Sequence, residues 1–411
     1  MKIKKFLSII LLVIILSFNS FCFAYDEDPD AWDYVWLNEA IEEANNSKEP
    51  NVLSRYAVIY DRNSGSVLWG KEENTKVPMA STTKIMTAIV LMENIGKDRL
   101  QEEIIVSKEA ANTIGSRLDI HTGNTITYND LLYGLMLCSG NDAAVQIAIS
   151  VAGSVENFVD LMNQKAETLG LENTHFVTPH GLDRDMHYTT ALELAKITDY
   201  ALKIPKIREV VATKEHTVVI NGIERTITNT NELLGYLNGV NGVKTGYTSK
   251  AGRCLVTSVK RDEFEIITVV LGADTRKIRT QDSIKLIEYA YKNYELVDIR
   301  EIAETEYENW LNINKKRIRI NKGTKRSPEV YLEESKYALY PVKQNNNISV
   351  ESEVITKLEA PVEQDMLVGK ITIKKDNEIL EEIPIRTKER VAKKGIASYL
   401  LEIIYLLKVI M

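Results

Sequence analysis

One segment, PMASTTKIMTA at residues 78–88, organises the rest of the sequence around it. Ser81 stands three residues before Lys84. The residues that follow are apolar at the spacing of a helix: Ile85, Met86, Ile89, Val90 and Met92. The pattern predicts a helix that begins near Ser81 and has one apolar face. Side chains three residues apart on a helix are neighbours, so Lys84 could take the proton of the Ser81 hydroxyl and make it a nucleophile.

A lysine can act as this base only when its pKa falls from about 10.4 toward neutrality. Burial, a helix N-terminus and a second cation all lower a lysine pKa, and Lys244 is the candidate for that cation. Taken alone, the simpler interpretation is that Ser81 caps the helix beside a solvated Lys84. The catalytic interpretation therefore needs support from the rest of the chain.

A second segment, Ser139-Gly140-Asn141, follows the apolar helical stretch 131–137 and precedes another helix start at Asp142. It predicts a tight connection between two helices, from which a hydroxyl and an amide point into a cleft. By itself the segment fits an ordinary Ser-Gly-Asn turn as well.

A third segment, Lys244-Thr245-Gly246, opens a block of strands. A cation and a hydroxyl side by side on a strand can bind a substrate carboxylate, and Gly246 would let the substrate backbone approach closely. An exposed lysine on an edge strand is the alternative interpretation.

The surrounding pattern predicts an α+β domain over residues 52–295. A hairpin is expected from 57–60 and 67–69, helix starts at Thr127 and Thr190, strands at 254–259 and 265–271, and a helix at 281–294. Short alternating segments without long helical patterns then predict a small all-β domain at 296–390.

Both ends of the chain have their own patterns. Residues 1–24 have the charged, apolar and small-residue order of a signal peptide, with an uncleaved membrane helix as the alternative. Residues 25–51 form an acidic leader, expected to be a solvated stalk with a short helix near 36–44. Residues 391–411 predict an amphipathic helix that lies on a membrane surface, with packing on the protein's own core as the alternative.

Composition excludes several classes of function. The net charge of −7 over 411 residues leaves no basic field for nucleic acid, and three cysteines are too few for a disulfide scaffold. His180 and His187 with Asp183 or Asp185 form the only metal-like grouping, and no His-Glu-x-x-His motif occurs. We therefore expect neither a metal nor another cofactor.

The three segments, in this order, resemble the serine D-alanyl-D-alanine carboxypeptidases of the penicillin-binding-protein-5 type. The similarity covers residues 54–294 strongly and includes the stretch Pro179-His180-Gly181-Leu182-Asp183. It differs at Tyr247, where the type enzyme has histidine. It extends weakly over the second domain, and the terminal amphipathic helix also fits the family pattern. The resemblance implies a β-lactamase/transpeptidase-like catalytic domain.

The resemblance also implies the roles of individual residues. Ser81 would be acylated by the penultimate D-alanine of a peptidoglycan stem pentapeptide, with Lys84 as its base. Ser139 would relay a proton to the leaving D-alanine, and Asn141 would orient Lys84 and the substrate. β-Lactams would acylate Ser81 as mimics of the substrate end.

The remaining roles fall on the third segment and on the end of the chain. Lys244 and Thr245 would hold the terminal carboxylate, beside Gly246. The backbone N–H groups of Ser81 and Tyr247 would form the oxyanion hole. The family further implies export, with the C-terminal helix tethering the enzyme to the outer face of the cytoplasmic membrane.

Two other functions remain open at this point. A class A β-lactamase shares the fold, but it carries Asp where this chain has Gly140, and it has neither a second domain nor a tether. A catalytically silent penicillin-binding scaffold of the cell wall is the alternative outside enzymes.

Overall fold

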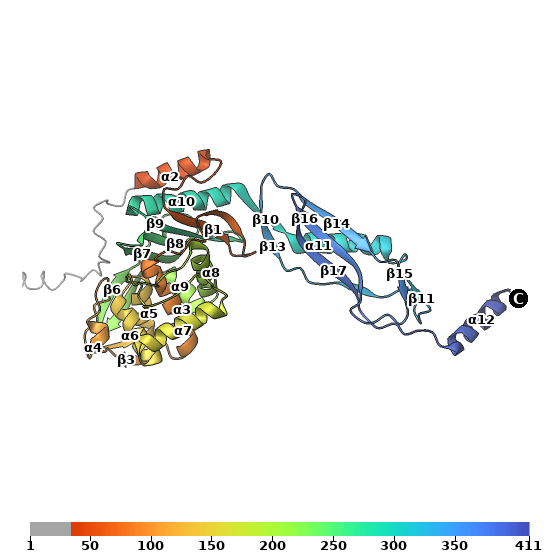
Figure 1. The fold of residues 1–411 in the computed structure, drawn as a ribbon, viewed down its shortest axis with the longest axis horizontal. Helices are drawn as coiled ribbons and strands as arrows, with labels where there is room; N and C mark the ends of the chain where they lie inside the picture. Colours follow the sequence, from red (N-terminus) through yellow and green to blue (C-terminus); the bar gives the residue numbers. More distant parts are fainter. Residues whose placement is uncertain (1–33, 411) are drawn as a thin grey trace, which may run out of the picture. The chain divides into compact units, whose positions relative to one another are not determined.

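The computed structural model describes residues 34–410, so the predicted signal peptide and the first residues of the acidic leader lie outside it. The described chain forms two compact units, one up to Lys292 and one from Asn293. Each unit has its own hydrophobic core. Figure 1 shows the fold of both.

The first unit is built on a five-stranded antiparallel sheet in the order β2-β1-β9-β8-β7. Its strands are β1 (Tyr56–Asp61), β2 (Val67–Lys71), β7 (Val240–Thr248), β8 (Gly252–Arg261) and β9 (Phe264–Ala273). The predicted hairpin is confirmed, because Ile59 of β1 pairs with Trp69 of β2. Strand β7 forms one edge of the sheet, so its outer side is available to a ligand. Two small antiparallel sheets of two strands complete the unit, β3 (Glu103–Ile105) with β4 (Thr125–Thr127) and β5 (Glu215–Ile220) with β6 (Ile223–Thr228).

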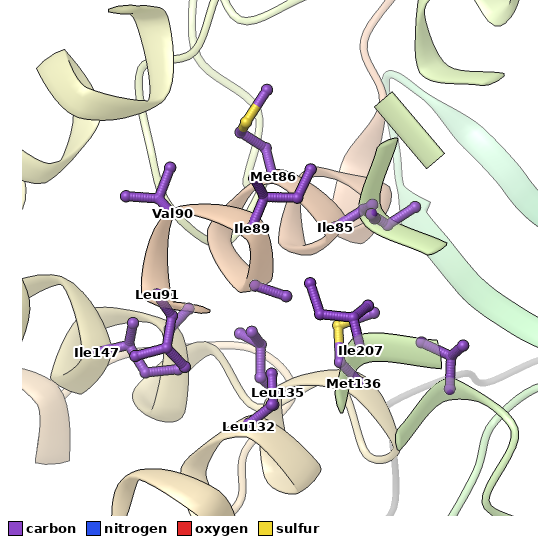
Figure 2. Packing of buried hydrophobic residues seen from close by; sticks show 14 of the residues in the cluster. Ile85, Met86, Ile89, Val90, Leu91, Leu132, Leu135, Met136, Ile147 and Ile207 are labelled. Carbon is purple, nitrogen blue, oxygen red and sulfur yellow. The ribbon is translucent and has the colours of Figure 1, made fainter. Parts of the chain in front are cut away.

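Helices cover both faces of this sheet (Figure 1). They are α2 (Tyr34–Asn46), α3 (Lys84–Ile95), α4 (Lys108–Ala111), α5 (Tyr128–Met136), α6 (Asn141–Ala152), α7 (Val155–Thr168), α8 (Ala191–Leu202), α9 (Pro205–Val211) and α10 (Arg276–Asn293). Helix α3 is buried along most of its length rather than on one face. Figure 2 shows its apolar side chains packed with Leu135 of α5, Ile147 of α6 and Ile207 of α9. This burial holds the N-terminus of α3 rigidly under the sheet edge.

Both predicted helix starts are confirmed by side-chain caps. Thr127 Oγ1 accepts a hydrogen bond from Asp130 N, and Thr190 Oγ1 accepts one from Glu193 N. The Glu193 carboxylate does not complete a capping box, because it binds Thr174 Oγ1 at 2.5 Å instead. Glu193 therefore ties α8 to the segment before it.

The interpretation of residues 25–51 as a solvated stalk is wrong for the described part. Helix α2 packs on α10 through Leu37, Ala40 and Ala44, which are buried. Lys285 of α10 pairs with Glu43 at 2.6 Å. The abundance of acids indicated solvation, but the apolar face of α2 is sufficient for docking.

The second unit contains a four-stranded antiparallel sheet in the order β12-β17-β16-β14. The strands of this sheet are β12 (Val330–Leu332), β14 (Ile348–Val354), β16 (Leu367–Lys375) and β17 (Glu378–Thr387). Two further pairs of strands belong to the unit, β10 (Tyr294–Asp298) with β13 (Leu339–Lys343) and β11 (Arg319–Asn321) with β15 (Lys357–Glu359). The β-rich character of this unit is as predicted.

The domain also contains one long helix that was not predicted for residues 296–390: α11 spans Ile299–Asn314 and packs on the sheet. Its face toward the core carries Ile299, Ala303 and Trp310, which are buried, and Ile302, Tyr307 and Leu311, which are partly buried. The Trp310 indole donates to Glu353 O at 2.9 Å. These side chains recur at the spacing of a helix, so the amphipathic pattern of α11 is present in the sequence and could have predicted it.

Helix α12 (Ile396–Ile410) ends the described chain. Ile396, Leu400 and Leu401 are all more than half exposed. Among the described residues no single helix has the length and apolar composition of a membrane span, although α6 and α7, bent by 86°, pass that test together.

Candidate active site

The Ser81–Lys84 pair lies at the point where a short turn becomes helix α3. The predicted helix begins three residues later than expected: Ser81 belongs to a 3₁₀ turn, η1 (Ala80–Thr83), and α3 begins at Lys84. Lys84 Nζ lies 2.8 Å from Ser81 Oγ. The cap residue of α3 is Thr83, so Ser81 does not serve as the cap.

Lys84 is completely buried and surrounded by acceptors. Besides Ser81 Oγ, its Nζ contacts Asn141 Oδ1 at 2.7 Å and the His180 carbonyl at 2.9 Å. Burial and the neighbouring Lys244 hold the pKa of Lys84 well below its usual range, against the opposing effect of Asp142. The solvated lysine of the alternative interpretation is therefore not what the structure contains.

Ser139 and Asn141 lie where α5 is connected to α6, and Asn141 contacts Lys84 from there. Ser139 has a positive φ of 62° and is 4% exposed. Its hydroxyl has no hydrogen-bond partner within the part of the chain that the structure describes. A buried hydroxyl without a partner costs free energy, so the turn keeps a donor ready for a substrate group.

Strand β7 brings the third segment against the nucleophile. A Cβ atom added to Gly246 would lie only 3.0 Å from Ser81 N. Lys244 is 1% exposed, which differs from the exposed edge lysine of the alternative interpretation. Burial lowers the pKa of Lys244 to about 7, with Cys138 opposing and Arg279 adding to the shift. Thr245 Oγ1 shares a hydrogen bond of 2.7 Å with Thr230 Oγ1.

Tyr247 lies near the end of this strand and is exposed, with 46% of its surface accessible. The guanidinium of Arg253, its partner on β8, stacks on the Tyr247 ring at 3.9 Å. Burial is the main reason that the pKa of Arg253 is lowered to about 10, and the neighbouring Arg279 and Arg276 add to the shift. Sequence reasoning missed Arg253, because only the strand register places it beside Tyr247.

The loop at residues 179–187 supports the nucleophile turn from behind. His187 Nδ1 accepts from Val177 N, so its Nε2 carries the proton and donates to Thr83 Oγ1 at 2.8 Å. Thr83 Oγ1 in turn donates to Ala80 O. Asp183 accepts from Thr248 Oγ1 at 2.7 Å and so joins the loop to β7. His180 Nδ1 accepts from Leu182 N at 3.1 Å, so both imidazoles and the Asp183 carboxylate hold the loop in place. Among the described residues no cluster suited to a metal ion was found.

The eight predicted site residues thus come from three separate elements. The nucleophile turn, the α5–α6 connection and β7 surround one place where a nucleophilic hydroxyl, a buried amine and a second lysine converge. This arrangement suits acyl transfer to Ser81 from a substrate that ends in a carboxylate.

Comparison with known proteins places this geometry in a family. Residues 43–275 match the family model described as D-alanyl-D-alanine carboxypeptidase, and residues 312–393 match that of the penicillin-binding protein 5 C-terminal domain. The chain is 33% identical to the D-alanyl-D-alanine carboxypeptidase DacF of Bacillus subtilis over 84% of its own length and 88% of DacF. It is 30% identical to DacA of Escherichia coli over 87% of its length and 88% of DacA.

Solved structures agree with these matches. Penicillin-binding protein 5 from Haemophilus influenzae superposes with a TM-score of 0.69 at 26% identity, covering 85% of this chain and all of that one. The Streptomyces K15 DD-transpeptidase gives a TM-score of 0.57 at 33% identity and covers 60% of this chain and all of that one. The transpeptidase-like fold and the family resemblance seen in the sequence are both confirmed. With two family models matched in order and relatives aligned along most of its length, this chain belongs to the D-alanyl-D-alanine carboxypeptidase family.

Proposed function

We propose that the chain is a serine carboxypeptidase that removes the terminal D-alanine from peptidoglycan stem pentapeptides through an acyl-enzyme on Ser81. The observation that carries the proposal is the fully buried Lys84 amine, 2.8 Å from Ser81 Oγ. A buried amine of low pKa is the base that a serine nucleophile requires.

The contacts of Lys84 indicate how it accepts the proton. A neutral lysine has two N–H groups and one lone pair. Asn141 Oδ1 and the His180 carbonyl take the two N–H groups, and the lone pair then faces the Ser81 hydroxyl. Ser81 attacks the carbonyl of the penultimate D-alanine as its proton passes to Lys84. Ser139, whose hydroxyl is otherwise unengaged among the described residues, relays a proton to the departing D-alanine nitrogen.

Strand β7 holds the end of the substrate. Lys244 and Thr245 bind the terminal carboxylate, and Gly246 allows the close approach of the substrate backbone. The backbone N–H groups of Ser81 and Tyr247 stabilise the oxyanion, so a tyrosine serves in place of the family histidine. Losing one such donor typically costs about 2.7–4 kcal/mol of barrier. Water then hydrolyses the acyl-enzyme, and β-lactams acylate Ser81 by the same route.

We also propose where the enzyme works and how the chain is divided. Residues 1–24 direct export, residues 52–295 form the catalytic domain and residues 296–390 the β-rich domain. Residues 391–411 tether the enzyme to the outer face of the cytoplasmic membrane. The exposed apolar side chains of α12 support a membrane surface as its partner.

The test combines two measurements on the same protein. Fluorescent penicillin should label the wild type but not Ser81→Ala, and incubation with a stem pentapeptide should release D-alanine, detected by mass spectrometry of muropeptides. Ser352→Ala, an exposed serine of the second unit, serves as the matched control and should retain both activities. Label that survives Ser81→Ala contradicts the proposal.

The same measurements separate the alternatives. Sustained nitrocefin turnover without D-alanine release would indicate a β-lactamase. A chain that takes no label would indicate a silent scaffold. The matches to the carboxypeptidase family model and to relatives named D-alanyl-D-alanine carboxypeptidase favour the carboxypeptidase over each of these.

A further inference from the structure

Asp142, the residue after Asn141, is a carboxylate with no exposed surface. Its oxygens accept hydrogen bonds from three consecutive backbone amides, those of Leu118 at 2.8 Å, Asp119 at 2.7 Å and Ile120 at 3.2 Å. Its own helix contributes a fourth, from Ala143 N. The guanidinium of Arg117, from the same segment as the three amides, lies 3.8 Å from Asp142 Oδ2. A carboxylate taken out of water needs such a set of donors, and in return it fixes the chain that supplies them.

The segment that Asp142 holds, residues 113–120, also contacts Asn141. The carbonyl of Ser116 accepts from Asn141 N at 2.7 Å. The carbonyl of Ile114 accepts from Asn141 Nδ2, also at 2.7 Å. With Nδ2 bound to a carbonyl, the amide can present only its oxygen to Lys84. If the Asn141 amide were reversed, its NH2 group would face the Lys84 amine and its oxygen would face the Ile114 carbonyl oxygen. Both hydrogen bonds would then be lost.

Close packing leaves this segment little freedom. A Cβ atom on Gly115, whose φ is +90°, would lie 2.5 Å from Asn141 Nδ2. A Cβ atom on Gly140 would lie 2.9 Å from both Asp142 Oδ1 and Leu118 N. Displacement of the segment is therefore transmitted directly to the Asn141 amide.

Asp142 also acts on Lys84 through its charge. The groups that influence Lys84 come from four places: Lys244 on β7, Asp142 on α6, Cys138 before α6, and His180, whose carbonyl accepts from Lys84. Burial and Lys244 lower the pKa of Lys84, whereas Asp142 and Cys138 raise it. Removing the negative charge of Asp142 therefore lowers the pKa of Lys84 further.

We propose that Asp142 is a positioning residue for the acylation of Ser81: it anchors segment 113–120 so that the Ile114 carbonyl holds the Asn141 amide with its oxygen on Lys84. This inference rests on the proposed function, because it concerns the base of the same reaction. No part of it requires Asp142 to touch the substrate.

The experiment measures the rate of acylation by fluorescent penicillin against pH for the wild type, Asp142→Asn and Asp160→Asn. Asp160 is the control, because it is an exposed acid of α7 that lies outside segment 113–120. Asp142→Asn should acylate about tenfold more slowly or worse, since several charge-assisted hydrogen bonds are lost together. The acid limb of its pH–rate profile should also move to lower pH, because Lys84 is neutral at lower pH without the negative charge beside it. Asp160→Asn should keep the wild-type rate and acid limb.

A second variant separates position from charge. Gly115→Ala pushes on Asn141 from the same segment but keeps the Asp142 side chain. It should slow acylation while the acid limb stays at the wild-type pH. Wild-type acylation by Asp142→Asn overturns the proposal. So does a slowed Asp142→Asn together with a Gly115→Ala that acylates at the wild-type rate, because segment 113–120 would then not act on the Asn141 amide.

The outcome also distinguishes this inference from the proposed function. A wild type that acylates but releases no D-alanine defeats the carboxypeptidase assignment, while the comparison of variants still decides the role of Asp142. A wild type that does not acylate defeats both.

Discussion

Lys84 and Lys244 are both removed from water, yet they stand in different surroundings. Lys84 has three acceptors, which leave it no free donor when charged. Lys244 makes one hydrogen bond within the described residues, to its neighbour's carbonyl, Thr245 O, at 3.0 Å. A neutral Lys84 suits a base, and a charged Lys244 with donors to spare suits a carboxylate receptor.

The role of Lys244 as the receptor for the substrate carboxylate leads to a prediction about pH. Burial holds the pKa of Lys244 near 7, so this lysine loses its charge as the pH rises above about 7. For a peptide with a free terminal carboxylate, kcat/KM should then fall by up to about tenfold per pH unit. Lys244→Arg, which stays charged, should shift this alkaline limb to higher pH even if the overall rate is lower.

Pre-steady-state kinetics across pH 5–10 check this prediction, with the exposed Lys260→Arg as the control. An alkaline limb at the same pH in Lys244→Arg would show that another group titrates. The sequence pointed to Lys244 as a cation beside a hydroxyl. It could not show that the lysine is buried, because burial here depends on strand β8 and on residues of α10 far along the chain.

At the scale of elements, the nucleophile turn depends on what packs behind it. Ala80, next to Ser81, has a positive φ of 48°, a conformation that costs a non-glycine residue about 1–2 kcal/mol. Thr83 and His187 hold its carbonyl side, and Gly181 of the supporting loop lies directly against it. The motif spacing predicted a helix that begins near Ser81 and gave no sign of the turn or of this support.

Gly181→Ala tests the contact between loop and turn. The added Cβ would lie 1.9 Å from the Ala80 carbonyl oxygen, which is backbone and cannot move aside without displacing Ser81. We expect acylation by fluorescent penicillin to fall by about a hundredfold, the size of effect seen when a reacting group is misplaced by about 1 Å. Gly170→Ala is the matched control, since it has a φ of +69° but nothing within 4 Å of its Cβ. Equal rates in the two variants would contradict the role assigned to Gly181.

Two elements were interpreted too narrowly from their local patterns. Helix α11 has apolar residues at the spacing of a helix, and that pattern could have predicted it: Ile299, Ile302, Ala303, Tyr307, Trp310 and Leu311. Helix α2 was expected as a short helix in a solvated stalk; the helix is present, but the burial of Leu37, Ala40 and Ala44 shows that it packs on the protein. An amphipathic pattern indicates a helix, but it does not say which surface covers the apolar face.

At the scale of the whole molecule, the proposed tether makes a prediction about membranes. A mature chain truncated before Lys393 should bind anionic vesicles at least about tenfold more weakly than the full chain, because membrane affinity scales with buried apolar area. Leu400→Asp with Leu401→Asp, at exposed positions of α12, should reproduce the loss in the full-length chain. Vesicle sedimentation measures both, and D-alanine release should be unchanged. Equal binding by truncated and full-length chains would refute the tether.

The sequence by itself determined the chemistry-bearing residues, the α+β class, the β-rich second domain and the family, because each of these depends on residue type at short spacing. Only the tertiary structure decided which of those residues are buried away from water. Contacts between segments far apart in the chain produce the burial of Lys84 and Lys244 and the anchoring of segment 113–120 by Asp142. They also leave the Ser139 hydroxyl buried with no partner among residues 34–410. A pKa, a strained turn and an oriented amide are properties of such surroundings, and no local pattern encodes them.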